Sequence, residues 1–378
     1  MQKQAQILFV FDWLVVGGEE TELRLLARYL RPRYQISVAA CFRNEHMTEL
    51  TVRNLQRMGI PLDTTCYALD DEGRRRYLAE KIRREQPDIV VACQGVTHAY
   101  RALELLEPHE RPILIEHGGL VVEATRTPKH LTTAYIGVCR DIVEAAQRVM
   151  PDPSRAYYIP SMVDLAEFEG HDRAEVRREL GFAPEHLVVG WVGRLDRKKR
   201  VEDFIEAAAI LRERLRRTRF VIIGGPDAFM PEYADELRAL ACERGLEPYL
   251  VFTGDRDDVP RLLHALDAYV WLSRGEGMPH AILEAGAARL PVIATRDGGT
   301  PDVIVDGETG LFVPHQAPAA VAAALERVLT QPALATRLGM NLRRRVEREF
   351  ATAVVCRQWE ELFERLLSER RSALGDAA

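Results

Sequence analysis

The chain has 378 residues, of which 47% are hydrophobic and 29% are charged, a composition typical of a folded globular protein. Because single hydrophobic cores stop growing near roughly 250–300 residues, this length predicts two domains. The 51 basic and 57 acidic residues give a net charge of −6, which excludes a globally basic nucleic-acid-binding protein.

The N-terminal half alternates short apolar runs with amphipathic segments such as Glu20–Leu30 and Arg75–Glu85. Continuous apolar strands separated by helices predict a parallel sheet that is covered on both faces. The predicted strands are Gln6–Phe11, Tyr34–Ala40, Asp88–Ala92, Pro112–Glu116, Ala134–Val138 and Ala156–Ile159.

The alternation is interrupted between positions 150 and 185. Met150–Ser161 carries three prolines, and Asp164–Glu185 is polar, with one short helical pattern at Arg173–Leu180. Prolines and polar residues of this kind favour a linker between domains.

A second alternation follows and predicts a second doubly wound domain, and the tail Val354–Arg371 after it predicts one amphipathic helix. Two such domains place a ligand at the carboxyl ends of their strands. The predicted strands are Leu187–Val192, Arg219–Ile223, Tyr249–Thr253, Ala268–Leu272 and Pro291–Ala294. The predicted helices are Val201–Arg217, Tyr233–Arg244, Val259–Ala265, Pro279–Arg289 and Pro318–Leu329.

No apolar run reaches the roughly 18 residues that spanning a bilayer requires, and the N-terminus lacks the pattern of a signal peptide. The six cysteines are scattered and form no C-x-x-C pair, so neither a zinc site nor a disulfide framework is indicated. These features predict a cytoplasmic protein.

A cluster of cations follows the first strand of the second half. The segment WVGRLDRKKR leaves the strand at Gly193, and a helix begins near Val201. Cations between a strand end and a helix N-terminus suit a diphosphate, although a solvated charge run is the simpler alternative. The cations are Arg194, Lys198, Lys199 and Arg200.

Two carboxylates stand eight residues apart in SRGEGMPHAILE. Glu276 lies in a glycine-flanked loop after a strand, and Glu284 lies inside an apolar helix. A carboxylate there can accept two vicinal hydroxyls of a ribose, unless it is an ordinary surface glutamate. The free amides of Gly277, Met278 and His280 at the helix start suit phosphate or sugar oxygens.

Three further features end predicted strands. The loop DGGTPD at Asp297–Asp302 allows a ligand to approach the backbone closely. Gly17 and Gly18 follow the first strand, but without the G-x-G-x-x-G spacing that a nicotinamide dinucleotide requires. His117 ends the strand ILIEH, where a side chain faces the ligand crevice.

Two segments have simple alternative explanations. Asp255–Asp257 has a D-x-D pattern that holds a metal in some sugar transferases. It lies before the predicted helix Val259–Ala265, which Asp257 or Asp258 can cap, and we predict no metal site. Arg74–Arg84 (RRRYLAEKIRR) predicts either a solvated basic helix or one that docks on an anionic membrane surface.

Together these motifs resemble the retaining GT-B glycosyltransferases of family 4, the glycosyl transferases group 1. The likeness covers nearly the whole chain and is strongest from Ile159 to Pro314. The segments that resemble family motifs are Gly17–Thr21 (GG-x-E), Ile159–Phe168 (IPNGVD-x-x-x-F), Val192–Lys199 (VGRL-x-x-x-KG), Glu276–Ala287 (E-x7-E), Pro291–Asp302 (PV-x-A-x-x-x-GG-x-x-E) and Asp306–Phe312 (D-G-x-x-G-x-L).

The resemblance implies an α/β protein of GT-B type, in which two doubly wound, Rossmann-like parallel-sheet domains face each other across a cleft. It assigns residues 1–163 and 352–378 to the acceptor side, with a returning C-terminal helix, and residues 164–351 to binding of the donor.

The resemblance also implies residue roles. Arg194 and Lys199 would bind the donor diphosphate and stabilise the leaving group, while Glu284 would hold the ribose hydroxyls. Glu276, with the amides of Gly277 and Met278, would contact the donor sugar. The remaining roles are for Gly17 and Gly18 under the diphosphate, for His117 against the transferred sugar, and for Arg256 near the base.

The expected activity is transfer of a sugar from a UDP- or GDP-sugar to a hydroxyl of a glycan, lipid-linked saccharide or small molecule. No metal or separate cofactor is expected, nor a nucleic-acid partner. The alternatives are a GT-B-fold sugar-nucleotide epimerase and a non-catalytic nucleotide-sugar binder.

Three positions depart from the family pattern. Arg200 and Arg289 replace glycines that the family usually has, and Asp302 replaces a glutamate. The two arginines call the geometry of their loops into question, because glycine adopts backbone conformations that other residues avoid.

Overall fold

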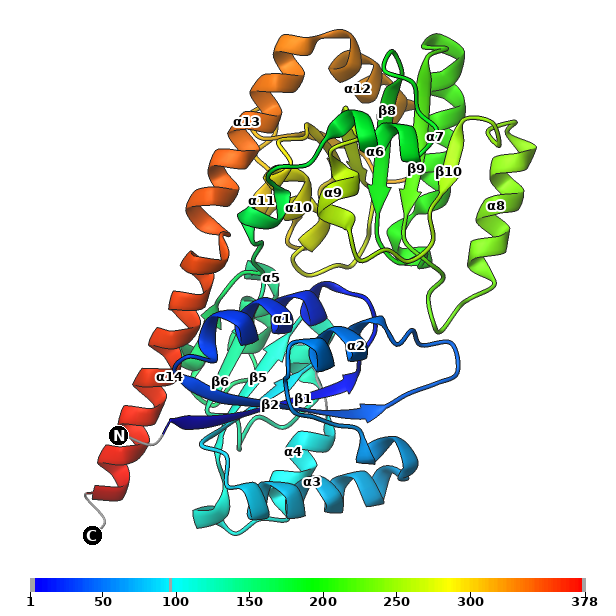
Figure 1. Cartoon of the computed structure of the whole chain (residues 1–378). Helices are drawn as coiled ribbons and strands as arrows, with labels where there is room; N and C mark the ends of the chain where they lie inside the picture. Colours follow the sequence, from blue (N-terminus) through cyan, green and yellow to red (C-terminus); the bar gives the residue numbers. More distant parts are fainter. Residues whose placement is uncertain (1–3, 95–96, 376–378) are drawn as a thin grey trace. The chain divides into compact units, whose positions relative to one another are not determined.

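The computed structural model describes residues 4–94 and 97–375. The chain forms two compact units, one made of Met1–Ser161 and Thr352–Ala378 and the other of Met162–Ala351 (Figure 1). The first, unit 1, is discontinuous in sequence, and the second, unit 2, is continuous.

Unit 1 is built on a seven-stranded sheet in which all strands are parallel, in the order β3-β2-β1-β4-β5-β6-β7. β1 lies between β2 and β4 and is buried over its central residues, as expected for an apolar strand covered on both faces. The strands are β1 (Ala5–Trp13), β2 (Tyr34–Phe42), β3 (Leu62–Asp63), β4 (Ile89–Cys93), β5 (Ile113–Gly118), β6 (Ala134–Gly137) and β7 (Ala156–Tyr158).

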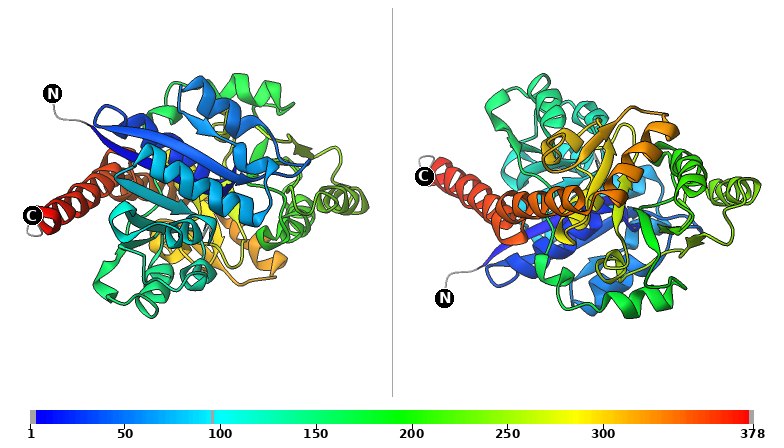
Figure 2. Two further views of the ribbon diagram at one scale, coloured as in Figure 1. Left: turned by 90° about the horizontal axis from the view of Figure 1, so that it is seen from below. Right: turned by 90° about the horizontal axis from the view of Figure 1, so that it is seen from above.

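Helices cover both faces of this sheet. Leu8 and Val10 of β1 belong to one apolar cluster with Leu78 of α3 and Tyr100 of α4, and the view from below in Figure 2 shows α3 lying across the strands. Residues on alternate positions of a strand point to opposite faces, so Phe9 belongs to the other face. The helices of unit 1 are α1 (Gly18–Leu30), α2 (Leu50–Arg57), α3 (Asp71–Glu85), α4 (Thr97–Glu104), α5 (Arg140–Gln147) and α14 (Thr352–Gly375).

The C-terminal helix α14 packs on unit 1 against α1 and the start of β2. Tyr34 donates a hydrogen bond of 2.7 Å to Glu364 Oε1, and its ring meets Phe363 edge-on at 5.6 Å. Trp359 and Phe363 are almost fully buried. The apolar face of α14 therefore completes the core of a unit whose other elements end about 190 residues earlier, before Met162–Ala351 begins.

Unit 2 has a six-stranded parallel sheet in the order β10-β9-β8-β11-β12-β13. Its strands are β8 (Leu187–Val192), β9 (Thr218–Ile223), β10 (Leu250–Phe252), β11 (Ala268–Trp271), β12 (Val292–Thr295) and β13 (Leu311–Val313). Its helices are α6 (Arg173–Glu179), α7 (Val201–Arg214), α8 (Tyr233–Glu243), α9 (Val259–Leu263), α10 (His280–Ala287), α11 (Thr300–Val303), α12 (Pro318–Thr330) and α13 (Pro332–Glu349).

The linker prediction is wrong for most of its length. Within Met150–Ser161, β7 pairs with β6 in the sheet of unit 1. Within Asp164–Glu185, α6 is held to unit 2 by Arg177, whose Nε donates to the Ala265 carbonyl at 2.9 Å and whose Nη2 meets Asp267 at 2.6 Å. The polar composition of the second segment therefore reflects specific side-chain bonding, and the two units divide between Ser161 and Met162.

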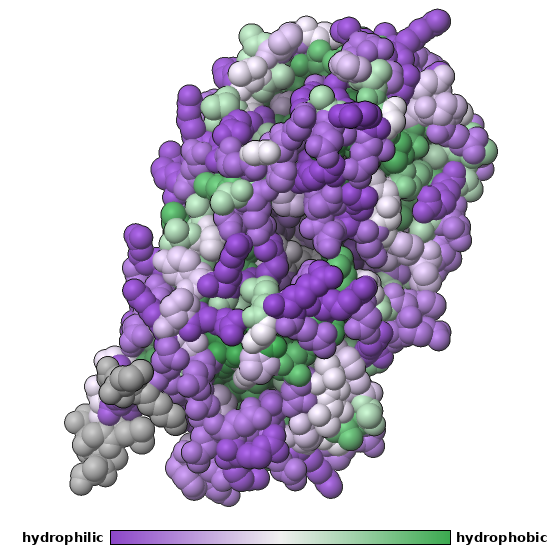
Figure 3. Space-filling model, in the orientation of Figure 1, coloured by the Kyte–Doolittle hydropathy of each residue, from purple (hydrophilic) through white to green (hydrophobic). Residues whose placement is uncertain are grey.

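Polar side chains cover most of the face seen in Figure 3, and the apolar groups on it are small and scattered. The large hydrophobic side chains that are exposed include Val121 and Val122, in the loop after β5. Among residues 4–94 and 97–375, every helix is too short or too polar to cross a bilayer.

Candidate active site

Three neighbouring strands of unit 2, β8, β11 and β12, end in loops that are hydrogen-bonded to one another. The Lys198 carbonyl, after β8, accepts bonds from the Arg274 amide at 2.8 Å and from Ser273 Oγ at 3.2 Å, both after β11. The Gly275 amide donates to Asp297 Oδ1, after β12, at 2.6 Å. The carboxyl edge of the sheet therefore has a fixed surface where ligands of doubly wound sheets bind.

An ion pair joins the first two of these loops. Lys199 Nζ lies 2.8 Å from Glu276 Oε2, and it also lies over the ring of Trp271, 4.6 Å from the ring centre. The short helical turn Arg197–Lys199 directs this lysine, because Asp196 caps the turn by accepting from the Lys198 amide at 2.8 Å. Lys199 is thus positioned by a carboxylate and an aromatic face together.

The Glu276 carboxylate remains ionised despite its surroundings. Burial raises its pKa, but the charge of Lys199 and the hydrogen bonds from Lys199 and Ser273 outweigh burial and hold the pKa below its ordinary value. Gly277 follows directly, and its carbonyl accepts from the Gly299 amide at 2.9 Å. The backbone is so close here that a Cβ at position 298 would lie 1.8 Å from the Glu276 carbonyl oxygen. Glycine is therefore required in this loop.

Arg194 is oriented by an aspartate that the sequence motifs did not include. Its guanidinium forms an ion pair with Asp227, which is only 2% exposed and accepts a second bond from the Phe229 amide at 2.8 Å. The loops after β8 and β9 meet at this point, because the Leu195 amide donates to the Gly225 carbonyl at 2.9 Å. The Arg194 head is partly exposed, with 29% of its side-chain surface accessible.

Glu284 is half-buried in α10, a helix whose other residues are nearly all buried. Its charge, after burial itself, helps to raise the pKa of the Tyr269 phenol. That phenol donates to the carbonyl of Val192, the last residue of β8, at 3.3 Å. Glu284 therefore lies close to the central strands of the sheet rather than on an outer helix surface.

Arg256 is engaged by carboxylates. Its Nε and Nη2 atoms bind Asp258 at 2.7 and 2.8 Å, and Nη2 also meets Glu179 of α6 at 3.0 Å. The hydrogen bond to Asp258 is the main cause that raises the pKa of this guanidinium. The structure thus turns Arg256 toward α6, and its expected role beside a base stays a prediction.

The two arginines at family glycine positions both adopt the left-handed backbone conformation that glycine favours, with φ of 54° at Arg200 and 61° at Arg289. Arg200 is held by two bonds to Asp203, of 2.9 and 3.0 Å. Arg289 ends α10 in a Schellman motif, in which its own amide donates to Gly286 and the Leu290 amide donates to Ala285. The glycine-type loop geometry is therefore kept.

Replacing Arg289 separates backbone strain from its ion pair. Arg289→Gly should be about 1 kcal/mol more stable than Arg289→Ala, because both lose the exposed bond to Glu169 but only glycine removes the left-handed strain. Hydrogen exchange of the α10 amides measures the difference. Equal protection in the two variants would show that position 289 is unstrained.

In unit 1, Gly17 precedes α1 and its carbonyl accepts from the amide and the hydroxyl of Thr21, at 3.1 and 3.0 Å. A Cβ at Gly17 would lie 2.7 Å from Glu20 Oε2. Glu20 closes the preceding loop, because its Oε1 accepts from the Val15 amide at 3.2 Å and from Gln94 Nε2 at 3.1 Å. The buried Glu20 carboxylate thus packs against the Gly17–Gly18 turn and fixes the loop before it.

His117 is almost fully buried near the end of β5, with 4% of its side chain exposed. Burial lowers its pKa to about 4, so its ring is neutral near pH 7. Its Nε2 atom faces Glu22 Oε1 of α1 at 3.6 Å, and its ring packs on Trp359 with centres 5.4 Å apart.

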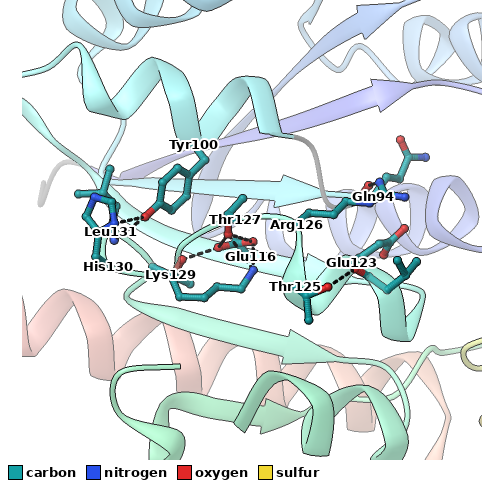
Figure 4. Close-up of polar contacts among 12 residues, drawn as sticks. Gln94, Tyr100, Glu116, Glu123, Thr125, Arg126, Thr127, Lys129, His130 and Leu131 are labelled. Carbon is teal, nitrogen blue, oxygen red and sulfur yellow. Dashed lines mark hydrogen bonds and ion pairs between the residues drawn. The ribbon is translucent and has the colours of Figure 1, made fainter. Parts of the chain in front are cut away.

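The residue before it, Glu116, anchors the loop that follows β5 (Figure 4). The Lys129 Nζ atom lies 2.7 Å from Glu116 Oε2, and both side chains are buried. Thr127 donates to the same carboxylate at 2.8 Å, and Thr132 does so as well. Charged groups this deeply buried are stable only when they are paired and hydrogen-bonded, so the cluster fixes the course of residues 119–132.

The basic run Arg74–Arg84 forms most of α3, and carboxylates balance much of its charge. Arg76 pairs with Glu72 at 2.7 Å, Lys81 with Asp63 at 2.9 Å, and Arg83 with Glu110 at 2.9 Å. Arg76 and Arg83 are exposed, as expected for a solvated helix face, whereas Lys81 is buried and has two carboxylate partners.

Within unit 2, the structure brings Lys199 and Glu276 into contact, and it turns Arg256 toward Glu179 of α6. Within unit 1, Gly17 and His117 both lie beside the carboxylates of α1. The sequence reasoning missed Trp271 and Asp227, which hold Lys199 and Arg194. A strand-end position was the only available signal for either, because the contacts join segments more than thirty residues apart.

Residues 172–345 match the model of the family described as glycosyl transferases group 1. This part of the chain belongs to that family. The match spans unit 2 from α6 to the last turns of α13 and includes Arg194, Lys199, Glu276 and Glu284.

Curated proteins also resemble the chain that contains this group 1 glycosyltransferase domain. The D-inositol 3-phosphate glycosyltransferase of Actinosynnema mirum is 35% identical over 196 residues, which are 50% of this chain and 47% of that protein. The protein of the same name from Mycobacterium marinum is 32% identical over 227 residues, 60% of this chain and 47% of its own. The chain thus spans about half the length of these relatives.

Solved structures share the fold of both units. HepE of Anabaena, crystallised with UDP and glucose, superimposes with a TM-score of 0.82 at 19% identity, covering 96% of this chain and 100% of its own. Sucrose-phosphate synthase of Thermosynechococcus elongatus gives 0.79 at 18% identity, covering 97% and 100%. The group 1 domain and the unit beside it in sequence therefore have the folds of a GT-B protein.

Proposed function

We propose that the protein is a glycosyltransferase that moves a sugar from a nucleotide-diphosphate sugar to a hydroxyl acceptor and retains the anomeric configuration. The observation that carries the proposal is the Lys199–Glu276 ion pair, 2.8 Å long, between two loops at the carboxyl edge of the unit 2 sheet. It combines a cation for a departing phosphate with a carboxylate for sugar hydroxyls.

The residue chemistry supports this reaction without a metal. Departure of a nucleoside diphosphate builds negative charge, which Arg194 and Lys199 are suited to offset. Glu276 and the amides of Gly277 and Met278 would hold the donor sugar while positive charge develops at its anomeric carbon. Chelation of divalent metals should therefore leave turnover unchanged, and we propose no cofactor besides the donor.

Unit 2 would bind the donor and unit 1 the acceptor. Gly17 and Gly18 would then lie under the diphosphate, His117 against the transferred sugar, and Arg256 near the base. The crystals of HepE with UDP and with UDP-glucose support UDP as the first nucleotide to test, with GDP as the second. The curated relatives support a small hydroxylated acceptor, since their name gives inositol 3-phosphate as theirs.

Titration calorimetry with UDP, GDP, ADP and the corresponding sugar nucleotides tests the donor site directly. Micromolar binding of one nucleotide supports the proposal, and absence of binding by all would contradict it. Product analysis then separates the alternatives. An epimerase converts the sugar nucleotide with no acceptor present, and a non-catalytic binder leaves it intact.

Replacing Glu284 tests the ribose contact. Glu284→Ala should weaken donor binding or kcat/KM roughly tenfold, about 1.4 kcal/mol, because a carboxylate that accepts two hydroxyls is lost. Calorimetry with the preferred nucleotide measures the effect. The exposed glutamate Glu243, at the end of α8, provides a control, since Glu243→Ala should bind as the unmodified protein does. Equal affinity in both variants would remove Glu284 from the site.

A cytoplasmic location and contact of the Arg74–Arg84 helix with a membrane stay predictions. Vesicles rich in anionic lipid should retain the protein at low salt if that helix docks on them. The carboxylates that pair with the helix weigh against this second prediction.

A further inference from the structure

Two buried polar atoms in unit 1 face each other and have no other partner. Glu22 Oε1 of α1 and His117 Nε2 of β5 lie 3.6 Å apart, and among the described residues neither forms a hydrogen bond. Their side chains are only 2% and 4% exposed, so both groups are removed from bulk solvent. Unsatisfied buried groups of this kind are rare and costly, and two that face each other are the natural donor and acceptor of one bond.

The surroundings hold both groups in place. The ring of His117 packs against Trp359, with ring centres 5.4 Å apart. The other oxygen of the carboxyl, Glu22 Oε2, accepts from Ser161 Oγ at 3.3 Å. Ser161 supplies a donor to Oε2, and the Trp359 indole is a second donor beside the carboxyl. We therefore place the carboxyl proton on Oε1, the oxygen turned toward the histidine.

We propose that Glu22 is a positioning residue for His117: its carboxyl proton, held on Oε1, is donated to His117 Nε2 and fixes the ring in the tautomer that carries its hydrogen on Nδ1. The role of His117 toward a sugar rests on the function proposed above, but the tautomer does not. Closing the pair requires only that the 3.6 Å separation shorten to the length of a hydrogen bond.

The charges around the pair agree with this assignment. Burial raises the pKa of Glu22 to about 8 and lowers that of His117 to about 4, so between these values both groups are neutral. The other titratable groups that face Glu22 are the Glu19 carboxyl on its own helix and two thiols, Cys93 of β4 and Cys356 of α14. None of them is a cation. Hydrogen bonds from Ser161 and Trp359 favour the ionised carboxylate, but burial outweighs them and keeps the pKa of Glu22 raised.

The proposal predicts a change of tautomer with pH. Above about pH 8 the Glu22 carboxyl loses its proton, and the imidazole then serves as the donor by moving its hydrogen from Nδ1 to Nε2. The proton that leaves goes to solvent and the charge of the ring stays zero. The nitrogen on the other side of the ring changes from a donor to an acceptor at the same time.

Nitrogen NMR of the full chain with labelled histidine tests the proposal, with His117→Asn identifying the signals. Near pH 6.5 we expect protonated Nδ1 and unprotonated Nε2, with the pattern reversing near pH 8. Glu22→Gln should keep the first pattern to high pH, because Ser161 selects the amide oxygen and leaves the amide NH2 facing Nε2. A hydrogen on Nε2 at pH 6.5 would overturn the proposal.

Glu22→Leu removes the donor without adding charge, and its ring should shift toward the tautomer protonated on Nε2. An unchanged His117 spectrum in Glu22→Leu would also overturn the proposal, and Glu22→Gln supplies the decisive comparison if the leucine variant does not fold. If the tautomer matters for transfer, kcat of the unmodified protein should fall above about pH 8. Glu22→Gln should keep kcat within about twofold and show no such fall, whereas Glu22→Leu should lower kcat roughly tenfold with little change in donor KM. The NMR spectra test the tautomer of His117 even if the protein shows no glycosyl transfer.

Discussion

Lys199→Ala is expected to lower kcat/KM at least a hundredfold, about 2.7 kcal/mol of transition-state stabilisation. The variant loses the cation opposite the leaving diphosphate, and it also leaves Glu276 without its 2.8 Å partner. Burial would then raise the pKa of Glu276 against only the Ser273 hydrogen bond and the charge of Lys198, because the charge of Lys199 is the largest influence that lowers it. Steady-state kinetics with the preferred donor measure the loss.

The neighbouring Lys198 provides a matched control. Its side chain is exposed and only its backbone amide and carbonyl take part in the loop, so Lys198→Ala should retain activity within about threefold. Lys199→Arg should recover part of the activity, since its cation can still reach the carboxylate and the Trp271 face. Similar losses in Lys198→Ala and Lys199→Ala would indicate a general charge effect and contradict the specific role of Lys199.

Lys129→Met should destabilise unit 1 by about 3–5 kcal/mol. The lysine is buried and pairs with Glu116 at 2.7 Å, and its removal leaves a buried carboxylate with only hydroxyl partners. Since a protein of two units need not unfold in one step, hydrogen exchange of the β5 and β6 amides is the suitable measurement. Protection there should fall, while amides of the unit 2 sheet keep theirs.

The double variant Lys129→Met with Glu116→Leu distinguishes the loss of the ion pair from the cost of leaving one buried charge without a partner. Because neither buried charge remains, this variant should regain most of the lost protection. Thr127 and Thr132 would lose an acceptor, so recovery should be incomplete. If Lys129→Met alone exchanged like the unmodified protein, the loop after β5 would not depend on this cluster.

The sequence predicts most strands of both sheets because each is a continuous apolar run between polar helices. β3 and β13 were missed for a physical reason. β3 has two residues and β13 has three, and β13 lies between Gly310 and Pro314, so neither gives a periodic signal. Both are terminal strands of their sheets, where a short pairing segment suffices.

The candidate site was predictable as far as its motifs extend. Lys199 and Glu276 belong to motifs that resemble a family, and the structure places them in contact. Trp271 could not be assigned, since an aromatic residue inside an apolar strand is indistinguishable from core. Arg200 and Arg289 show a different limit of sequence-based prediction. Both keep the left-handed backbone conformation, but the glycine that would have signalled it is absent from the sequence.

The discontinuity of unit 1 has a consequence for biosynthesis. α14 supplies Trp359 and Phe363 to the core of unit 1, yet the ribosome makes it only after all of Met162–Ala351. At 5–20 residues per second, that delay is roughly 10–40 s. During this interval the nascent unit 1 exposes the apolar surface that α14 later covers, and a chaperone on the emerging chain has its natural binding site there.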